Sequence, residues 1–366
     1  MKIICNKIKL QEAVLNVQRA VSPKSTIPAL EGILIETENN QVKLSGYNLE
    51  LGITTMIEAE IEQEGKSVLN ARLLAEIVRK MPAENIEIDS NKQNIATIKS
   101  GASEFAIVEI SSIEYPELPT LQQSTQIDIP SLIMKSMIKQ TLFAVADNDT
   151  KPIHTGILFD INDKLIQLVA VDGYRLALRR ENIQSEENTS FVVPGKTLNE
   201  VVKLLPDNED KITIFQGSRH VIFRVKEYTI ISRLLEGEFL DYKSAIPDAY
   251  ATKARVNTRD FIESVERMSL LINDRIKSPL RCIMSNNEIK FSCSTSIGKA
   301  NDEIQANIDG NSLEIGFNNK YLLDALKNSL CDEIQIQLNG PLSPMKVLPL
   351  EGNSFLFLVL PVRLKT

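Results

Sequence analysis

Apolar residues recur at helical spacing in three segments of the chain that share one pattern. The segments are NARLLAEIVRKMP from Asn70, PGKTLNEVVKLLP from Pro194 and NNKYLLDALKNSL from Asn318. At about 100° per residue, the apolar positions of the first segment fall on one side: Leu74, Ile77, Val78 and Met81. The pattern predicts one amphipathic helix with one buried face in each segment.

The opposite side of each predicted helix carries an acid between two bases. These triplets are Arg72, Glu76 and Arg79; Lys196, Glu200 and Lys203; and Lys320, Asp324 and Lys327. A solvated face with helix-stabilising charge pairs would explain one such triplet. Its appearance three times favours a face that contacts another molecule.

The acids of these triplets are 124 residues apart in both intervals. This period is too long for a solenoid repeat and fits a small domain. We therefore predict three similar domains, covering residues 1–125, 126–250 and 251–366.

Each predicted domain shows the same order of elements, in which a first helix precedes alternating strands and the repeated helix precedes further strands. Gly32 recurs as Gly156 at the start of the strands, and Pro279 takes this place in the third copy. The polar, Pro-containing stretches 115–124 and 236–250 are typical of linkers. This order predicts an α+β fold with mostly antiparallel pairing.

The composition is that of an ordinary soluble protein, with 43% hydrophobic and 24% charged residues. No apolar run is long enough for a signal peptide or a membrane span, so we expect a cytoplasmic protein without a membrane partner. The four cysteines lack CxxC spacing and have no histidine nearby. They predict reduced thiols and no metal site.

The distribution of charge is more informative than the net value of −7, which by itself argues against binding to nucleic acid. Six predicted helical segments carry a net +9, which leaves −16 on the rest of the chain: 7–24, 66–80, 131–148, 194–205, 258–277 and 317–330. Bases on helices and acids on strands and loops favour helices that face phosphate groups.

Helix dimensions limit how such helices can surround a duplex. Six helices packed side by side in a ring leave a hole of about 10 Å, which is too narrow for duplex DNA. Twelve leave a hole of about 30 Å. Two chains would therefore be needed, and an edge strand over residues 104–110 is a candidate for pairing with the third domain of a partner chain.

Signs of catalysis are absent from the sequence. The two histidines, His154 and His220, have no serine, cysteine or carboxylate placed to form a triad with them. Neither GxxxxGK[ST] nor GxGxxG occurs, so no phosphate-cradling loop is predicted. We expect no catalytic residue and no cofactor.

Two short motifs allow two interpretations each. VDGYRLAL, residues 171–178, reads as an Asp-Gly turn before a strand, or as part of a peptide pocket in which Tyr174 and Arg175 project beside apolar residues. FLVLPVRL, residues 357–364, reads as an edge strand that closes the last sheet, or as a second part of the same pocket.

Together with further motifs, these two make the whole chain resemble the DNA sliding clamp family, the β subunits of bacterial DNA polymerase III. The carrying motifs are STIPALEGILIE, LSGYNLELGI, LFDI with VAVDGYRLAL, VVPGKTLNEVVKLL, EGEFLDY and the terminal LPVRL. The resemblance implies a head-to-tail homodimeric ring with helices lining the hole and sheets outside. Such a ring is threaded by duplex DNA without sequence preference and acts as a non-catalytic processivity factor.

The family's partners follow from the same resemblance. They are the replicative polymerase α subunit, a clamp loader ATPase and other proteins that carry a clamp-binding motif. Three rival classes make different demands on the chain. A peptide-binding scaffold needs no basic helix face, a DNA-binding regulator shows sequence preference, and an enzyme shows turnover.

The resemblance also assigns residues to two sites. Four cations match positions that face DNA in the family: Lys24, Arg72, Lys151 and Lys196. Twelve residues match a pocket between the second and third domains that receives a partner's peptide: His154, Gly173, Tyr174, Arg175, Leu176, Pro247, Pro344, Leu358, Leu360, Pro361, Val362 and Arg363. The pocket's edge departs from the family pattern at His154, at Leu240 and in the C-terminal extension Lys365 and Thr366.

Overall fold

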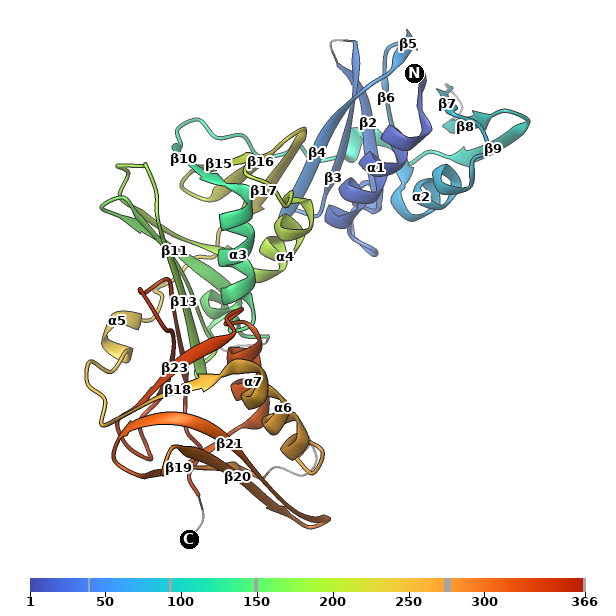
Figure 1. The fold of residues 1–366 in the computed structure, drawn as a ribbon. Helices are drawn as coiled ribbons and strands as arrows, with labels where there is room; N and C mark the ends of the chain where they lie inside the picture. The colour runs from blue at the N-terminus through green and yellow to red at the C-terminus, as the bar shows by residue number, and fades with distance from the viewer. Residues whose placement is uncertain (39, 92–93, 148–150, 273–277, 365–366) are drawn as a thin grey trace. The chain divides into compact units, whose positions relative to one another are not determined.

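The computed structural model describes residues 1–366 except 39, 92–93, 148–150, 273–277 and 365–366. The described residues, whose helices and strands are drawn in Figure 1, form two compact units by their internal contacts. Unit one comprises Met1–Leu132 and Asn199–Leu234, and unit two comprises Ile133–Leu198 and Leu235–Thr366. Helices α3 (Ser131–Leu142) and α4 (Gly195–Leu204) each contribute residues to both units.

Unit one contains a five-stranded antiparallel sheet in the order β5-β1-β7-β8-β9. Its strands are β1 (Lys2–Asn6), β5 (Glu60–Gln63), β7 (Asn85–Ser90), β8 (Ile95–Ser100) and β9 (Ser103–Val108). Helices α1 (Lys7–Val17) and α2 (Ala71–Lys80) pack against each other, and short 3-10 turns flank them: η1 (Gln18–Ala20), η2 (Pro28–Glu31) and η3 (Ser112–Glu114).

An eight-stranded antiparallel sheet completes unit one, in the order β10-β15-β16-β17-β4-β3-β2-β6. Its strands are β2 (Gly32–Glu38), β3 (Gln41–Tyr47), β4 (Leu51–Glu58), β6 (Lys66–Asn70), β10 (Thr125–Pro130), β15 (Lys211–Gln216), β16 (His220–Val225) and β17 (Tyr228–Arg233). The β4–β17 pairing joins strands of the first and second sequence repeats, so the sheet is shared between repeats.

Unit two contains a twelve-stranded sheet in the order β14-β11-β12-β13-β25-β24-β23-β18-β21-β20-β19-β22. Strands of the second repeat are β11 (Gly156–Asn162), β12 (Leu165–Val171), β13 (Arg175–Asn182) and β14 (Thr189–Pro194). Strands of the third are β18 (Thr252–Asn257), β19 (Leu280–Ser285), β20 (Glu288–Thr295), β21 (Gly298–Gly310), β22 (Leu313–Phe317), β23 (Glu333–Leu338), β24 (Met345–Pro349) and β25 (Phe355–Val359).

The helices of unit two are α5 (Tyr242–Ala245), α6 (Thr258–Ser269) and α7 (Asn319–Lys327), with the 3-10 turn η4 (Pro152–Thr155). α6 and α7 lie side by side (Figure 1). No helix in the described ranges is long and apolar enough to cross a membrane.

Asparagine side chains cap the N-termini of four helices, each of which directly follows a strand. Each side-chain oxygen accepts hydrogen bonds from backbone N–H groups of the first turn, which otherwise have no partner. These N-caps are Asn6 of α1, Asn70 of α2, Asn257 of α6 and Asn318 of α7.

The stripe predicted for the first repeated helix is confirmed, because its four apolar residues are all buried in α2 or at its C-cap. The third copy buries the equivalent face of α7 through Leu322, Ala325 and Leu326. The helices are shorter than the predicted segments, however. Residues 66–70 form β6 instead of helix, and residues 273–277 lie outside the described ranges. The six long helices consequently carry a net +6 in place of +9, and α6 carries −1.

Of the two interpretations of FLVLPVRL, that of an edge strand that closes the last sheet is wrong. β25 lies inside the twelve-stranded sheet, with β13 of the second repeat on one side and β24 on the other. The strand predicted over residues 104–110 is β9, which lies at the edge of its sheet and ends at Val108. The chain then leaves the sheet, and Ile110 forms an isolated bridge with Val68.

Both predicted linkers fold against a sheet. Tyr115 is buried and its hydroxyl donates to the backbone oxygen of Ser45 at 3.0 Å. Tyr242, on α5, is buried as well and donates to Asp160 Oδ2 at 2.6 Å. The aromatic ring in each linker explains the difference, because its burial stabilises the fold while its hydroxyl finds an acceptor.

Candidate partner-binding and DNA-contact sites

The Asp-Gly interpretation of the VDGYRLAL motif is confirmed by the backbone. Asp172 Oδ1 accepts hydrogen bonds from the backbone nitrogens of Tyr174 and Arg175, at 2.9 and 3.0 Å. Gly173 between them has a φ of +84°, a left-handed conformation that side-chain-bearing residues adopt at a cost. The turn fixes the start of β13 and the direction of the two following side chains.

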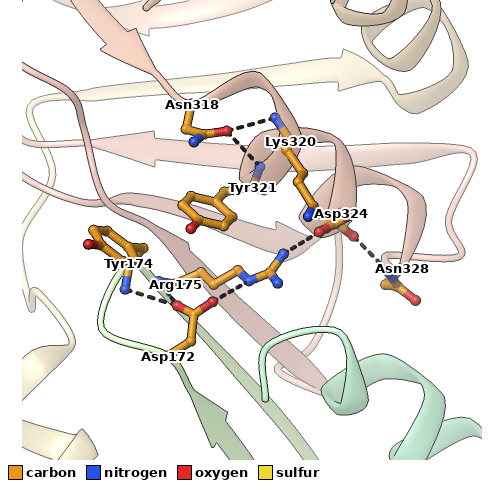
Figure 2. Close-up of polar contacts among 8 residues, drawn as sticks. All are labelled: Asp172, Tyr174, Arg175, Asn318, Lys320, Tyr321, Asp324 and Asn328. Carbon is orange, nitrogen blue, oxygen red and sulfur yellow. Dashed lines mark hydrogen bonds and ion pairs between the residues drawn. The ribbon is translucent and has the colours of Figure 1, made fainter. Parts of the chain in front are cut away.

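Arg175 is the charged centre of this site and is only 8% exposed. Its guanidinium donates to Asp172 Oδ2 at 2.9 Å and forms an ion pair with Asp324 on α7 (Figure 2). It also lies over the ring of Tyr321, 4.8 Å from the centroid. Two carboxylates and an aromatic face compensate the buried charge. The arginine thereby connects the end of a second-repeat turn to a third-repeat helix.

Tyr174 projects from the same turn in another direction. Its ring stacks on that of Tyr321 with centroids 5.4 Å apart and an interplanar angle of 16° (Figure 2). Tyr321 is held in place because Asn318 caps the start of α7 and accepts from its backbone nitrogen. Tyr174 remains exposed, so the ring pair presents an aromatic surface to solvent.

An apolar wall lies next to this aromatic pair. Leu176 of β13 is opposite Leu358 of β25, and both belong to a cluster of buried residues with Ile153 and Tyr242. Phe239, which is partly buried, packs on this cluster and meets the His154 ring edge-on, with centroids 5.7 Å apart. Buried leucines with exposed apolar residues at the rim suit contact with an apolar side chain of a partner.

The C-terminal residues continue from this wall to another part of the same sheet. The backbone nitrogen of Leu360 donates to the oxygen of Tyr174 at 2.9 Å, and that of Val362 donates to the oxygen of Gly316 at 2.8 Å. Pro361 between them forms a bridge with Phe317. The side chains of Leu360 and Val362 are exposed.

The remaining predicted pocket residues lie on the segments that border the wall. Lys346 Nζ donates to the backbone oxygen of Pro247 at 2.7 Å, which ties the second linker to β24. Pro344 precedes Met345, the residue opposite Val359. Arg363 is exposed after the last bridge, and Lys365 and Thr366 lie outside the described residues. All twelve predicted pocket residues thus belong to unit two, around the junction of β13, β25 and α7.

Sequence reasoning missed several residues of this site: Asp172, Tyr321, Phe143, Tyr242 and the role of Asp324. Phe143 lies under the Arg175 guanidinium, 5.6 Å from it. One signal was available, since the third repeated helix carries Asp where the others carry Glu. The aspartate side chain is shorter than that of glutamate, so Asp324 reaches less far into solvent and can pair with a nearby residue such as Arg175.

The four predicted DNA-contact residues are all exposed: Lys24, Arg72, Lys151 and Lys196. Lys24 and Arg72 belong to unit one, and Lys151 and Lys196 to unit two. Arg72 pairs with Glu76 one turn along α2, at 3.4 Å.

The acids of the three triplets have different partners. Glu76 contacts Arg72 on its own helix, Glu200 contacts both Lys203 and Arg19, and Asp324 contacts Arg175. The bases at the first and third positions of the triplets remain exposed in every copy. The repeated element is therefore a pair of exposed cations, whereas the acid pairs with a different cation in each copy.

Fold and site together define a class: proteins built from tandem α+β domains whose sheets continue from one domain into the next. Three family models match this chain in succession, described as the N-terminal, central and C-terminal domains of the DNA polymerase III beta subunit. They cover residues 1–119, 128–241 and 243–363. The chain belongs to the DNA polymerase III beta subunit family.

Individual relatives are similar over nearly the whole length. The beta sliding clamp of Bacillus subtilis strain 168 is 36% identical, with 99% of this chain and 100% of that protein covered. That of Staphylococcus epidermidis is 34% identical, with 94% of each chain covered. The crystal structure of the Bacillus subtilis sliding clamp aligns with a TM-score of 0.97, 34% identity and 100% of each chain covered. The Pseudomonas aeruginosa subunit beta aligns with a TM-score of 0.95 and 26% identity, again over 100% of each chain.

Proposed function

We propose that this chain is a DNA sliding clamp, of which two copies close head to tail into a ring around duplex DNA. Its three domains cover residues 1–125, 126–250 and 251–366, and the ring tethers the replicative polymerase without taking part in chemistry. The observation that carries the proposal is a pair of strand edges. Each has no partner strand among the described residues once the pairings between repeats have been assigned.

Two strand pairings join successive repeats, and both use the same kinds of strand. β4 pairs with β17 between the first and second repeats, and β13 pairs with β25 between the second and third. In the order of each repeat, β13 is the counterpart of β4, and β25 is the counterpart of β17. The counterpart of β4 and β13 in the third repeat is β21. The counterpart of β17 and β25 in the first repeat is β9. In the described part of the chain, β9 pairs on one side with β8, and residues 298–305 of β21 pair on one side with β20.

These two free edges complement each other in register. At the second junction Ala177 lies opposite Phe357, and the first junction places the equivalent residues opposite each other: Ile53 and Ile230. The hairpin pairs Leu165–Asn182 and Glu288–Gln305 align β13 with β21 and make Ala300 the counterpart of Ala177. The hairpin pairs of β9 and β17 align in the same way and make Phe105 the counterpart of Ile230. Ile230 is in turn the equivalent of Phe357, so Phe105 is the counterpart of Phe357 as well. We therefore expect Ala300 of one copy to lie opposite Phe105 of the other.

Apolar residues exposed near both edges support this pairing. Val108, at the end of β9, is 77% exposed, and Phe105 is partly exposed. Near β21, Leu270 is 80% exposed and Ile297 is exposed as well. Unpaired strand edges with apolar neighbours are unfavourable in a monomer, and pairing with a second copy buries both. Because each copy has one edge of each kind, two copies close a ring by two equivalent contacts.

Four exposed cations supply the contact with DNA; Arg72 and Lys196 lie on repeated helices, and Lys24 and Lys151 lie outside them. Lysine and arginine that meet phosphates without reading bases give weak, salt-dependent binding at any sequence, which permits sliding. Lys24, Arg72, Lys151 and Lys196 are the residues we assign to this contact. Retention then depends on closure of the ring.

The junction of β13, β25 and α7 is the site we assign to partner peptides. The replicative polymerase α subunit, a clamp loader ATPase and other proteins with the same motif would place apolar side chains against the exposed Leu360 and Val362, which follow the wall of Leu176 and Leu358. The stacked pair of Tyr174 and Tyr321 borders this wall and offers an aromatic contact. A cytoplasmic location agrees with these partners.

Cysteine cross-linking tests the expected register. Phe105→Cys combined with Ala300→Cys should form a covalent dimer on mild oxidation, resolved by non-reducing electrophoresis. All variants carry Cys293→Ser, because Cys293 lies directly opposite Ala300 in the β20–β21 pair. Each single variant controls for the other native thiols, of which Cys5 and Cys282 are buried. The matched control is Phe105→Cys with Asn301→Cys, because a slip of one residue turns the side chain to the opposite face of the sheet.

Efficient cross-linking in the first pair and little in the second is the expected result. Equal cross-linking in both pairs, or monomeric wild-type protein by sedimentation at micromolar concentration, would contradict the head-to-tail ring.

A further inference from the structure

Unit one has a groove of about 910 Å³ on one face of its eight-stranded sheet, at the junction of β4 and β17. Strands β2, β3, β4, β6, β15, β16 and β17 contribute to its floor, and the linker after Ser112 forms a wall. By position in the repeat, this junction is the counterpart of the β13–β25 junction, to which the proposed function assigns partner peptides.

The two junctions differ in chemistry at equivalent positions. In unit two the positions carry apolar or uncharged residues: Val169, Leu178, Leu348, Leu356, Gln167 and Ser190. In unit one they carry polar or basic residues: Ser45, Thr54, Arg224, Thr229, Lys43 and Lys66. At one position the difference is reversed, because unit one has the apolar Ile222 where unit two has the basic Lys346. The groove in unit one has thus become polar and basic on the same backbone.

Two of the three cations that line the groove, Lys66 and Arg224, form no ion pair within the described residues. Arg224 rests over the Phe215 ring at 4.6 Å. Lys43 is 3.7 Å from Glu38, at the limit of an ion pair. Two acids, Glu36 and Glu117, also line the groove, so its charge is mixed with a cationic excess.

A buried hydroxyl at the floor also lacks a partner. Ser45 Oγ is buried and makes no hydrogen bond to any described residue, although buried polar groups are nearly always paired. The backbone oxygen of the same residue is used by the Tyr115 hydroxyl at 3.0 Å. The linker wall is therefore fixed, and the hydroxyl of Ser45, a residue that lines the groove, has no hydrogen-bond partner among the described residues.

Apolar contacts are available beside the cations. Ile113 of the linker is 90% exposed at the rim, and Leu118 lies against the sheet, where a side chain at Gly52 would come within 3.0 Å of it. An apolar rim next to cations suits a chain that carries carboxylates and apolar side chains in turn, as an extended peptide does.

From these features we infer that the groove at the β4–β17 junction binds an extended acidic peptide of a partner protein. Its carboxylates contact Lys66 and Arg224, and its apolar side chains contact Ile113. This second site is separate in position and in chemistry from the apolar site of unit two, so one chain holds two partner segments of different composition.

Fluorescence polarisation with the full chain tests this inference. The probe is a fluorescein-labelled octapeptide of alternating glutamate and leucine, and the matched probe has glutamine in place of each glutamate. We expect saturable binding of the acidic probe and at least about tenfold weaker binding of the glutamine probe. Lys66→Gln with Arg224→Gln should weaken the acidic probe about tenfold or more, whereas Lys211→Gln with Lys253→Gln, two cations outside the groove, should leave it unchanged.

A second comparison separates this site from the proposed function. Deletion of residues 361–366 should leave binding of the acidic probe unchanged even though it removes part of the unit two site. Equal binding of both probes, a loss of binding on the C-terminal deletion, or no effect of the Lys66 and Arg224 changes would overturn the inference. A higher affinity of the groove for a single-stranded oligonucleotide than for the acidic probe, lost in the same double variant, would overturn it as well.

Discussion

Replacing Arg175 by methionine tests how the candidate partner site is held together. Methionine keeps much of the apolar stem and removes the guanidinium, which is the shared partner of Asp172 and Asp324. The Asp172 side chain is 11% exposed and that of Asp324 is 32% exposed. Asp172 would therefore remain nearly buried without a cation, whereas Asp324 can turn toward water.

The magnitude follows from the cost of an unpaired buried charge. Removal of one member of a buried ion pair costs about 3–5 kcal/mol. Because Asp324 is partly solvated, we expect the lower end of this range, about 3 kcal/mol, for Arg175→Met. This free energy corresponds to roughly a hundredfold change in a local opening equilibrium.

Amide hydrogen exchange is the suitable assay, because a chain with two units does not unfold as one two-state system. Exchange of the β13 and α7 amides should accelerate about a hundredfold in Arg175→Met. Amides of α1, in the other unit, provide the internal reference.

A double variant separates the unpaired charge from lost packing. Asp172→Asn retains an acceptor for the two backbone nitrogens of the turn and removes the negative charge. Combined with Arg175→Met, it should recover about 1 kcal/mol or more. Unchanged exchange in Arg175→Met, or no recovery in the double variant, would refute the view that this ion-pair network stabilises the site.

Further predictions concern the backbone, the pH dependence and the C-terminus. Gly156→Ala should lower the free energy of unfolding by about 2 kcal/mol, because the new Cβ would lie 2.6 Å from the backbone oxygen of Val193. Gly173→Ala meets open space and should cost about 1 kcal/mol through its φ of +84° alone; amide hydrogen exchange of the flanking strands compares the two variants. Burial and two neighbouring arginines lower the pKa of His220, so the unfolded chain binds this proton more readily and stability falls as the pH drops below about 6.5. The loss of stability between pH 7 and pH 5 should be smaller in His220→Gln, and an equal loss would contradict this assignment. Deletion of residues 361–366 should abolish polymerase binding in a pull-down and leave the dimer intact in sedimentation; retained binding would remove these residues from the partner site.

Local elements of the fold follow from the sequence because their signals are local. The buried stripe of α2 and the Asp-Gly turn before β13 each arise from residues within one or two turns of chain. Contacts between repeats carry no such signal. β25 reads as an edge strand, yet it pairs with β13 about 180 positions earlier, and strand pairing of this kind depends on the whole chain.

The candidate site shows the same limit. Asp324 occupies the acid position of the repeated triplet, whose recurrence predicts a helix face that contacts another molecule. In the structure it pairs with Arg175, 149 positions away, because α7 and the β13 turn meet at one junction. Tyr115 similarly reads as part of a linker, although its ring is buried and its hydroxyl bonded.

Retention on DNA tests the sliding-clamp proposal most directly. The protein is loaded on nicked circular DNA with its clamp loader and ATP, and the complex is then washed at a salt concentration that removes ordinary DNA-binding proteins. A single linearising cut follows. Retention before the cut and loss after it is the predicted result, because a closed ring leaves DNA only over an end. Retention after the cut would mean that affinity holds the protein, and it would contradict a ring that encircles DNA.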